Sequence, residues 1–172
     1  MQENKPVLIV GLGNPGNEYA RTRHNVGFMA VEYLAGDDAK WKSEFLARTF
    51  TTNVDGRRVI FAMPQTYMND SGRAVRAIMD FYKIPVENLI VIHDDMDLKL
   101  GDMRTKIGGT SAGHNGIKSI DAAVGREYMR VRIGIDHPRN LGLDVDAADW
   151  VLGRFTPEQL LVINDTIKKI VL

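Results

Sequence analysis

Three histidines and a short run of aspartates in this 172-residue chain could carry out acid–base or metal chemistry. The histidines are His24, His93 and His114, and the aspartates lie in the segment His93–Asp97. Histidine titrates near pH 6.5, so a neutral imidazole can accept a proton from water at physiological pH. A carboxylate bonded to its second ring nitrogen would fix the tautomer and stabilise the imidazolium that forms. We therefore expect His24 and Asp94 to form a pair that activates water.

The same residue types could instead bind a metal ion. No two histidines have the HxxxH or HExxH spacing of a helical zinc site. The segment Gly11–Asn14 is nevertheless similar to the start of hydrogenase-maturation peptidases, which use a metal on an α/β frame. A metal-dependent peptidase therefore remains an alternative. Its possible ligands would be His24, His93, His114, Asp94, Asp95 and Asp97.

A second alternative is a serine esterase. Gly109–Gly113 matches the GxSxG pattern, in which Ser111 would be the nucleophile. The histidine partner of such a serine is expected later in the chain, but His137 is followed directly by Pro138, and the chain is short for a serine hydrolase. The simpler interpretation is a loop that needs small residues.

The segment Gly11–Gly16 also spells GxGxxG, the fingerprint of dinucleotide binding. That fingerprint should lead directly into a helix, whereas Pro15 and Gly16 indicate a turn. The acidic residue expected at the end of a second strand is missing, because Glu32 lies inside a predicted helix. The pattern therefore does not predict a nicotinamide cofactor.

Apolar patterns predict the elements that must position these residues. Val7–Gly11 and Leu89–Ile92 are continuous apolar runs, typical of strands buried on both faces, and Met129–Ile135 alternates as a strand does. Thr156–Gln159 has the spacing of a helix capping box. The chain is predicted to be one α/β domain over residues 1–172, a mixed twisted sheet flanked by helices. The other expected elements are strands 45–53, 57–63 and 103–107, and helices 27–35, 71–82, 116–124 and one starting near 157.

Polar loops follow several of the expected strands. In open α/β sheets, functional sites collect outside the carboxyl ends of the strands. We therefore expect four loops to meet at one edge of the sheet. These loops are 11–25, 63–69, 93–97 and 106–116.

Composition and charge limit the class of protein. The 22 basic and 22 acidic residues balance, but the segment Lys99–Arg139 carries eight basic and four acidic ones, a local excess suited to a few phosphates. The absence of cysteine excludes disulfides, thiolate nucleophiles and cysteine metal sites. No apolar run reaches the ~20 residues of a membrane span, and Met1–Lys5 does not resemble a signal peptide. We expect a cytoplasmic globular protein.

In these loops the sequence resembles the bacterial peptidyl-tRNA hydrolase family. The similarity runs in order from about Val7 to Phe155. It implies a monomer without cofactor, metal or obligate protein partner. It also implies hydrolysis of the ester that links a peptide to the 3′ end of tRNA, which recycles tRNA during translation. The matching motifs are GLGNPGNEYARTRHNVG (11–27), YMNDSG (67–72), HDDMDL (93–98), GHNGIKSI (113–120) and RVRIGI (130–135).

The resemblance assigns roles to residues. It implies that His24 is the catalytic base, that Asp94 holds it in its basic form, and that Asn14 favours N-blocked aminoacyl groups. The remaining matched positions would bind substrate. They are Asn69 and Asn115 for the peptide and the water, Tyr19 and Tyr67 for the cleft, and Arg104, Lys106 and Arg132 for tRNA phosphate.

Two departures from the family pattern bear on function. Ala112 stands in a loop where the family favours glycine, which could stiffen that loop. The sequence also stops at Leu172, about twenty residues before the family's usual end, so the C-terminal helix is expected to be shortened. A non-catalytic RNA-binding module remains a further alternative.

Overall fold

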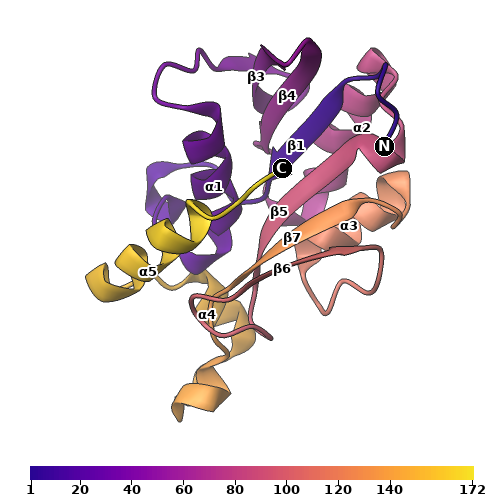
Figure 1. Cartoon of the computed structure of the whole chain (residues 1–172). Helices are drawn as coiled ribbons and strands as arrows, with labels where there is room; N and C mark the ends of the chain where they lie inside the picture. The colour runs from indigo at the N-terminus through magenta and orange to yellow at the C-terminus, as the bar shows by residue number, and fades with distance from the viewer.

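A seven-stranded mixed sheet forms the centre of the computed structural model, which describes residues 1–172 (Figure 1). The strand order is β2-β3-β4-β1-β5-β7-β6. The four inner strands β4, β1, β5 and β7 are parallel to one another. At the sides, β3 pairs antiparallel with β4 and with β2, and β6 pairs antiparallel with β7. The strands are β1 (Val7–Gly11), β2 (Lys42–Glu44), β3 (Ala47–Val54), β4 (Arg57–Pro64), β5 (Leu89–Asp95), β6 (Met103–Ile107) and β7 (Met129–Gly134).

Helices cover both faces of the sheet. In Figure 1, α2 and α3 lie on one face and α1 and α5 on the other. Successive residues of β1 point to opposite faces, so Leu8 and Val10 pack with α2 and α3, while Val7 and Ile9 pack with α1 and α5. None of the helices has the length and apolar character needed to cross a membrane. They are α1 (Val26–Ala35), α2 (Ser71–Tyr82), α3 (Asn115–Val124), α4 (Ala147–Leu152) and α5 (Pro157–Ile167).

The predicted α/β class with a mixed sheet between helices is confirmed. The capping box at Thr156 is present, with the Thr156 hydroxyl accepting from the backbone of Gln159 and the Gln159 side chain accepting from the backbone of Thr156. The strand expected to end at Ile92 continues to Asp95, because it pairs with β7 as far as Gly134. The sequence patterns did not indicate β2 or α4, which are only three and six residues long.

A glycine near the start of α1 lets this helix approach the sheet edge closely. A Cβ added to Gly27 would lie 2.4 Å from both the carbonyl oxygen of Ile92 and the backbone nitrogen of Leu12. The Leu12 N–H also donates to the Ile92 carbonyl, at 3.1 Å. The short turn before α1, which carries His24, is thereby held against the carboxyl ends of β1 and β5.

Candidate active site

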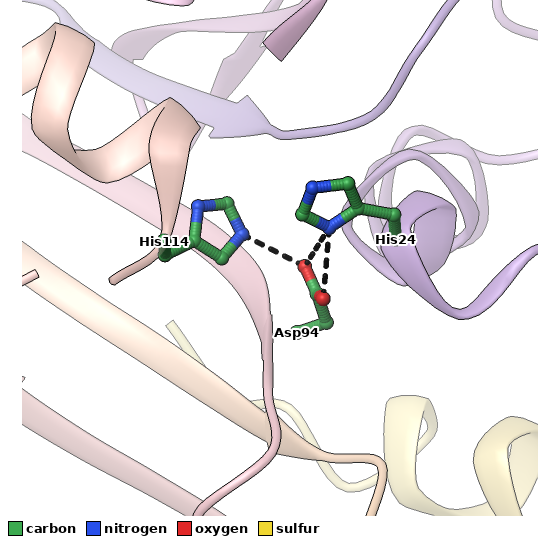
Figure 2. A group of neighbouring side chains, drawn as sticks. All are labelled: His24, Asp94 and His114. Carbon is green, nitrogen blue, oxygen red and sulfur yellow. Dashed lines mark hydrogen bonds and ion pairs between the residues drawn. The ribbon is translucent and has the colours of Figure 1, made fainter. Parts of the chain in front are cut away.

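The carboxylate of Asp94 lies between two histidines from different loops (Figure 2). His24 Nδ1 lies 2.9 Å from Asp94 Oδ2 and 3.0 Å from Oδ1. His114 Nε2 lies 2.8 Å from Oδ1. The Asp94 side chain is only 2% exposed, and those of His24 and His114 are 10% and 8% exposed. Three residues far apart in the sequence therefore form one buried hydrogen-bonded group.

Hydrogen bonding fixes the tautomers of both imidazoles. His114 is the N-cap of α3, where its Nδ1 accepts the backbone N–H of Ile117 at 3.3 Å. Its Nε2 must therefore carry the proton donated to Asp94. His24 donates to the same carboxylate through Nδ1, which leaves its Nε2 unprotonated in the neutral form. His24 can thus accept a proton at Nε2 while its orientation is held at Nδ1.

The pKa values agree with this arrangement. Burial disfavours the imidazolium of His24, but the charge and hydrogen bond of Asp94 outweigh burial, so the pKa of His24 lies above its ordinary value. Burial alone would raise the pKa of Asp94, yet the two histidines bring it well below the ordinary range. Asp94 is therefore ionised throughout the neutral range and stabilises a proton taken up by His24.

His93 packs against this group but makes no hydrogen bond to the Asp94 carboxylate. Its ring packs edge-on against His114, with ring centroids 5.0 Å apart, and its Nδ1 lies 2.8 Å from the carbonyl oxygen of Asp94. The carbonyl can only accept, so Nδ1 of His93 carries a proton. Burial, aided by the nearby His114, lowers the pKa of His93 to about 4.

A cavity of about 180 Å³ opens beside the His24–Asp94–His114 group. Ser111 and Asn115 line it, and Asn115 is exposed. The Ser111 hydroxyl makes no hydrogen bond to a histidine, and only the Ser111 carbonyl does so, accepting the backbone N–H of His114 at 2.9 Å. The GxSxG pattern therefore does not produce a nucleophile–base pair here. Ala112 adopts a φ of 48°, a left-handed conformation that glycine adopts more readily.

Asn14 is buried and held by backbone contacts. Its Oδ1 accepts the N–H of Met68 at 2.9 Å, and its own backbone N–H donates to Asn25 Oδ1 at 2.8 Å. The Met68 N–H fills one of the two acceptor positions of this oxygen. The Nδ2 group of Asn14, which can only donate, makes no hydrogen bond within the protein and is free to contact a substrate.

The remaining cleft residues lie at the surface of neighbouring turns. Tyr19 and Tyr67 come together edge-on with ring centroids 6.3 Å apart, so the structure brings these two predicted residues together. Asn69 is exposed, in the 3₁₀ turn Met68–Asp70, and no hydrogen bond fixes its side chain.

The three predicted phosphate ligands lie on the antiparallel pair β6–β7. Arg104 is directly opposite Arg132 in the register and two residues from Lys106, so the three side chains share a face of the sheet. Arg104 and Lys106 are exposed. Arg132 Nε donates to Asp95 Oδ2 at 2.7 Å, which leaves its two terminal nitrogens available.

The nitrogen and oxygen atoms of His24, Asp94 and His114 lie within 4.8 Å of one another, so their types and spacing could also suit a metal ion. Coordination through His114 Nε2 would move the ring proton to Nδ1. That proton would then face the N–H of Ile117, which already points at Nδ1. Asp95, another possible ligand, is bonded to Arg132 and to the backbone of Asp97. These hydrogen bonds therefore favour a metal-free pair of His24 and Asp94 over a metal site.

Sequence reasoning named His114 only as a possible metal ligand and missed its bond to Asp94. The available signal was its position directly before a helix, where a side chain that accepts from the backbone is favoured. It also missed Ala147, Ala148 and Val151, the residues of α4 that line the cavity.

Comparisons with known proteins agree with the fold and with the family that the sequence resembles. Residues 8–172 match the family model described as peptidyl-tRNA hydrolase. The chain is 44% identical to a peptidyl-tRNA hydrolase of Rickettsia bellii, over 95% of this chain and 89% of the relative. It is 47% identical to that of Bacillus cytotoxicus, over 94% and 87%. The crystal structure of the Acinetobacter baumannii peptidyl-tRNA hydrolase superposes with a TM-score of 0.88 at 39% identity, covering 98% of this chain and 85% of that one.

The buried neutral His93 should make the fold sensitive to acid. The unfolded chain binds a proton at this residue below about pH 6.5, but the folded chain does so only near pH 4. The free energy of unfolding should therefore decrease as pH falls from about 6.5 to 4, by up to roughly 3 kcal/mol from this residue. Urea unfolding of wild type and His93→Gln at pH 7 and pH 4.5 measures the contribution. Equal losses of stability in the two proteins would contradict it.

Proposed function

Because this chain belongs to the peptidyl-tRNA hydrolase family, we propose that it hydrolyses the ester between a peptide and the terminal ribose of tRNA, using water activated by His24 and Asp94. The observation that carries this proposal is the buried Asp94 carboxylate, which accepts from His24 Nδ1 and leaves Nε2 free as a base. An ester has a good leaving group, so the reaction requires no covalent intermediate.

In the proposed reaction His24 Nε2 removes a proton from a water molecule while the water oxygen bonds to the ester carbonyl carbon. Asp94 stabilises the imidazolium that results. The ester C–O bond then breaks, and the imidazolium returns the proton to the departing ribose oxygen. His114 makes the second hydrogen bond to Asp94, so the carboxylate keeps one orientation through both steps.

Asparagine side chains are suited to the peptide side of the ester. The free Nδ2 of Asn14 can donate to the carbonyl of an N-acyl group, which a free amino group lacks. Asn69 and Asn115 are exposed amides that can hold the peptide backbone or donate toward the developing oxyanion. Tyr19 and Tyr67 provide an aromatic surface at the same edge of the sheet.

The tRNA side of the ester is assigned to β6 and β7. Arg104, Lys106 and Arg132 supply positive charge on one face of this pair. The neighbouring Arg130 is buried and bonded to Asp121, so it is not available to a phosphate.

The first prediction of this proposed function separates its mechanism from that of a metal-dependent or serine enzyme. Hydrolysis of N-acetyl-aminoacyl-tRNA should persist in EDTA, fall roughly 10²–10⁴-fold in His24→Ala and remain in Ser111→Ala. Activity should rise with pH through an apparent pKa above 6.5, because Asp94 raises the pKa of His24, which must be neutral to act as a base. Inhibition by EDTA that added metal reverses would favour the metal alternative, and labelling of Ser111 by a fluorophosphonate would favour the serine esterase.

The second prediction concerns tRNA phosphate. Lys106→Ala and Arg132→Ala should raise KM for acylated tRNA but leave cleavage of a small acyl-adenosine ester nearly unchanged. Each lost phosphate contact should reduce the slope of log affinity against log salt by about one. Lys42→Ala is the matched control, because Lys42 is exposed on β2 at the opposite side of the sheet. Equal salt slopes in all four proteins would remove both residues from the tRNA site.

The third prediction concerns discrimination by Asn14. Asn14→Asp keeps an oxygen for the Met68 N–H but replaces the free Nδ2 donor with a second oxygen. The preference for N-blocked over free aminoacyl-tRNA should fall by roughly 2–10-fold, the value of one hydrogen bond. The two kcat/KM values give the preference, and Asn14→Ala, which also loses the turn anchor, is the stability control. If Asn14 only stabilises its turn, the ratio will stay at the wild-type value in both variants.

A further inference from the structure

The residue before the proposed base His24, Arg23, is buried although no ion pair neutralises it. Only 6% of it is exposed. Burial lowers the pKa of Arg23, while the charge of Asp136 opposes this shift. A buried cation is costly unless its surroundings compensate its charge. The groups that contact the guanidinium therefore identify the segments that Arg23 joins to its own turn.

The direct contacts of the Arg23 guanidinium come from one stretch near the C-terminus. The guanidinium carbon lies 3.5 Å from the centre of the Trp150 ring, a cation–π contact. Its Nη1 donates to the Trp150 carbonyl at 3.2 Å, and its Nη2 donates to Gln159 Oε1 at 3.3 Å. The backbone N–H of Arg23 donates to the Gly153 carbonyl at 3.0 Å.

This C-terminal stretch also borders the catalytic cavity. Ala147, Ala148 and Val151 of α4 line the cavity beside His24. The Trp150 ring N–H donates to the carbonyl of Asp136 at 2.8 Å, which ties α4 to the segment just after β7.

The helix that follows is joined to the same arginine. Gln159 Oε1 accepts from Thr156 in the capping box of α5 and from Arg23 at the same time. Arg23 therefore joins the cap of α5 and the helix α4 to the turn that carries His24.

We propose that Arg23 is a positioning residue, which fixes the His24 turn against α4 and the α5 cap so that His24 Nδ1 stays aligned with Asp94. The proposal rests on the proposed function, in which His24 is the base. Displacement of a reacting group by about 1 Å can lower a rate by about 10²-fold. Loss of the Arg23 contacts should therefore reduce kcat much more than it changes KM.

The experiment changes Arg23 itself and, separately, the residues that it contacts. Arg23→Met removes the guanidinium, and Gly153→Ala places a Cβ 2.5 Å from Arg23 Nη1 at a backbone conformation that alanine adopts readily. Gln159→Glu keeps an oxygen for both hydrogen bonds, whereas Gln159→Ala removes it. Arg21→Ala is the matched control, an exposed arginine of the same loop. Each protein is assayed with acyl-adenosine ester, and the fraction folded is measured by circular dichroism.

Per folded molecule, Arg23→Met should lose about 10²-fold in kcat. Gly153→Ala and Gln159→Ala should lose less, and Gln159→Glu and Arg21→Ala should retain wild-type kcat. NMR titration of the His24 ring, which faces Asp94 and His114, should give a lower pKa in Arg23→Met because the bond to Asp94 is weakened.

A kcat per folded molecule that matches wild type, or an unchanged His24 pKa in both Arg23→Met and Gly153→Ala, would overturn the proposal. Gly153→Ala supplies the answer if Arg23→Met does not fold. The NMR titration requires no turnover, so it tests the positioning role even if wild type proves inactive toward the ester. Inactive wild type would count against the proposed function alone.

Discussion

The buried carboxylate of Asp94 constrains much of the surrounding structure. An ionised carboxylate removed from water costs several kcal/mol unless hydrogen bonds and opposite charge replace its hydration. Two ring N–H groups meet this requirement, from His24 and His114. The loop before α1 and the loop before α3 must therefore both reach the end of β5. The hydrogen bond from His24 that stabilises this buried charge also orients the proposed base. Stability and the proposed catalysis therefore depend on the same contact.

Much of this arrangement could be predicted from the sequence. Val7–Gly11 and Leu89–Ile92 read as strands buried on both faces, and parallel strands of that kind present their following loops at one edge. That rule alone places the segment around His24 near Asp94. The resemblance to a known family then assigned the pair its role, and the structure places the two side chains in contact.

The remaining details depend on hydrogen bonds between side chains and individual backbone groups. Which nitrogen of His114 is protonated depends on the N–H of Ile117, and which end of the Asn14 amide is free depends on the N–H of Met68. The position of His114 directly before a helix is a signal for the first contact, whereas the contact between Asn14 and Met68 leaves no pattern in the sequence. Helix α4 escaped prediction because six residues are too few to show a helical repeat. The burial of Arg23 depends on Trp150, 127 positions later in the chain.

The turn Arg23–Asn25 explains how one short segment meets several of these demands. It is a 3₁₀ turn, which has three residues per turn, so its three side chains leave the axis in three different directions. Arg23 reaches α4 and the cap of α5, His24 reaches Asp94, and Asn25 bonds to both backbone groups of Asn14. An α-helical turn would spread these directions less evenly. Because all three side chains are buried and bonded, the central one has little freedom to rotate, and a base held in this way loses little entropy when it meets its water.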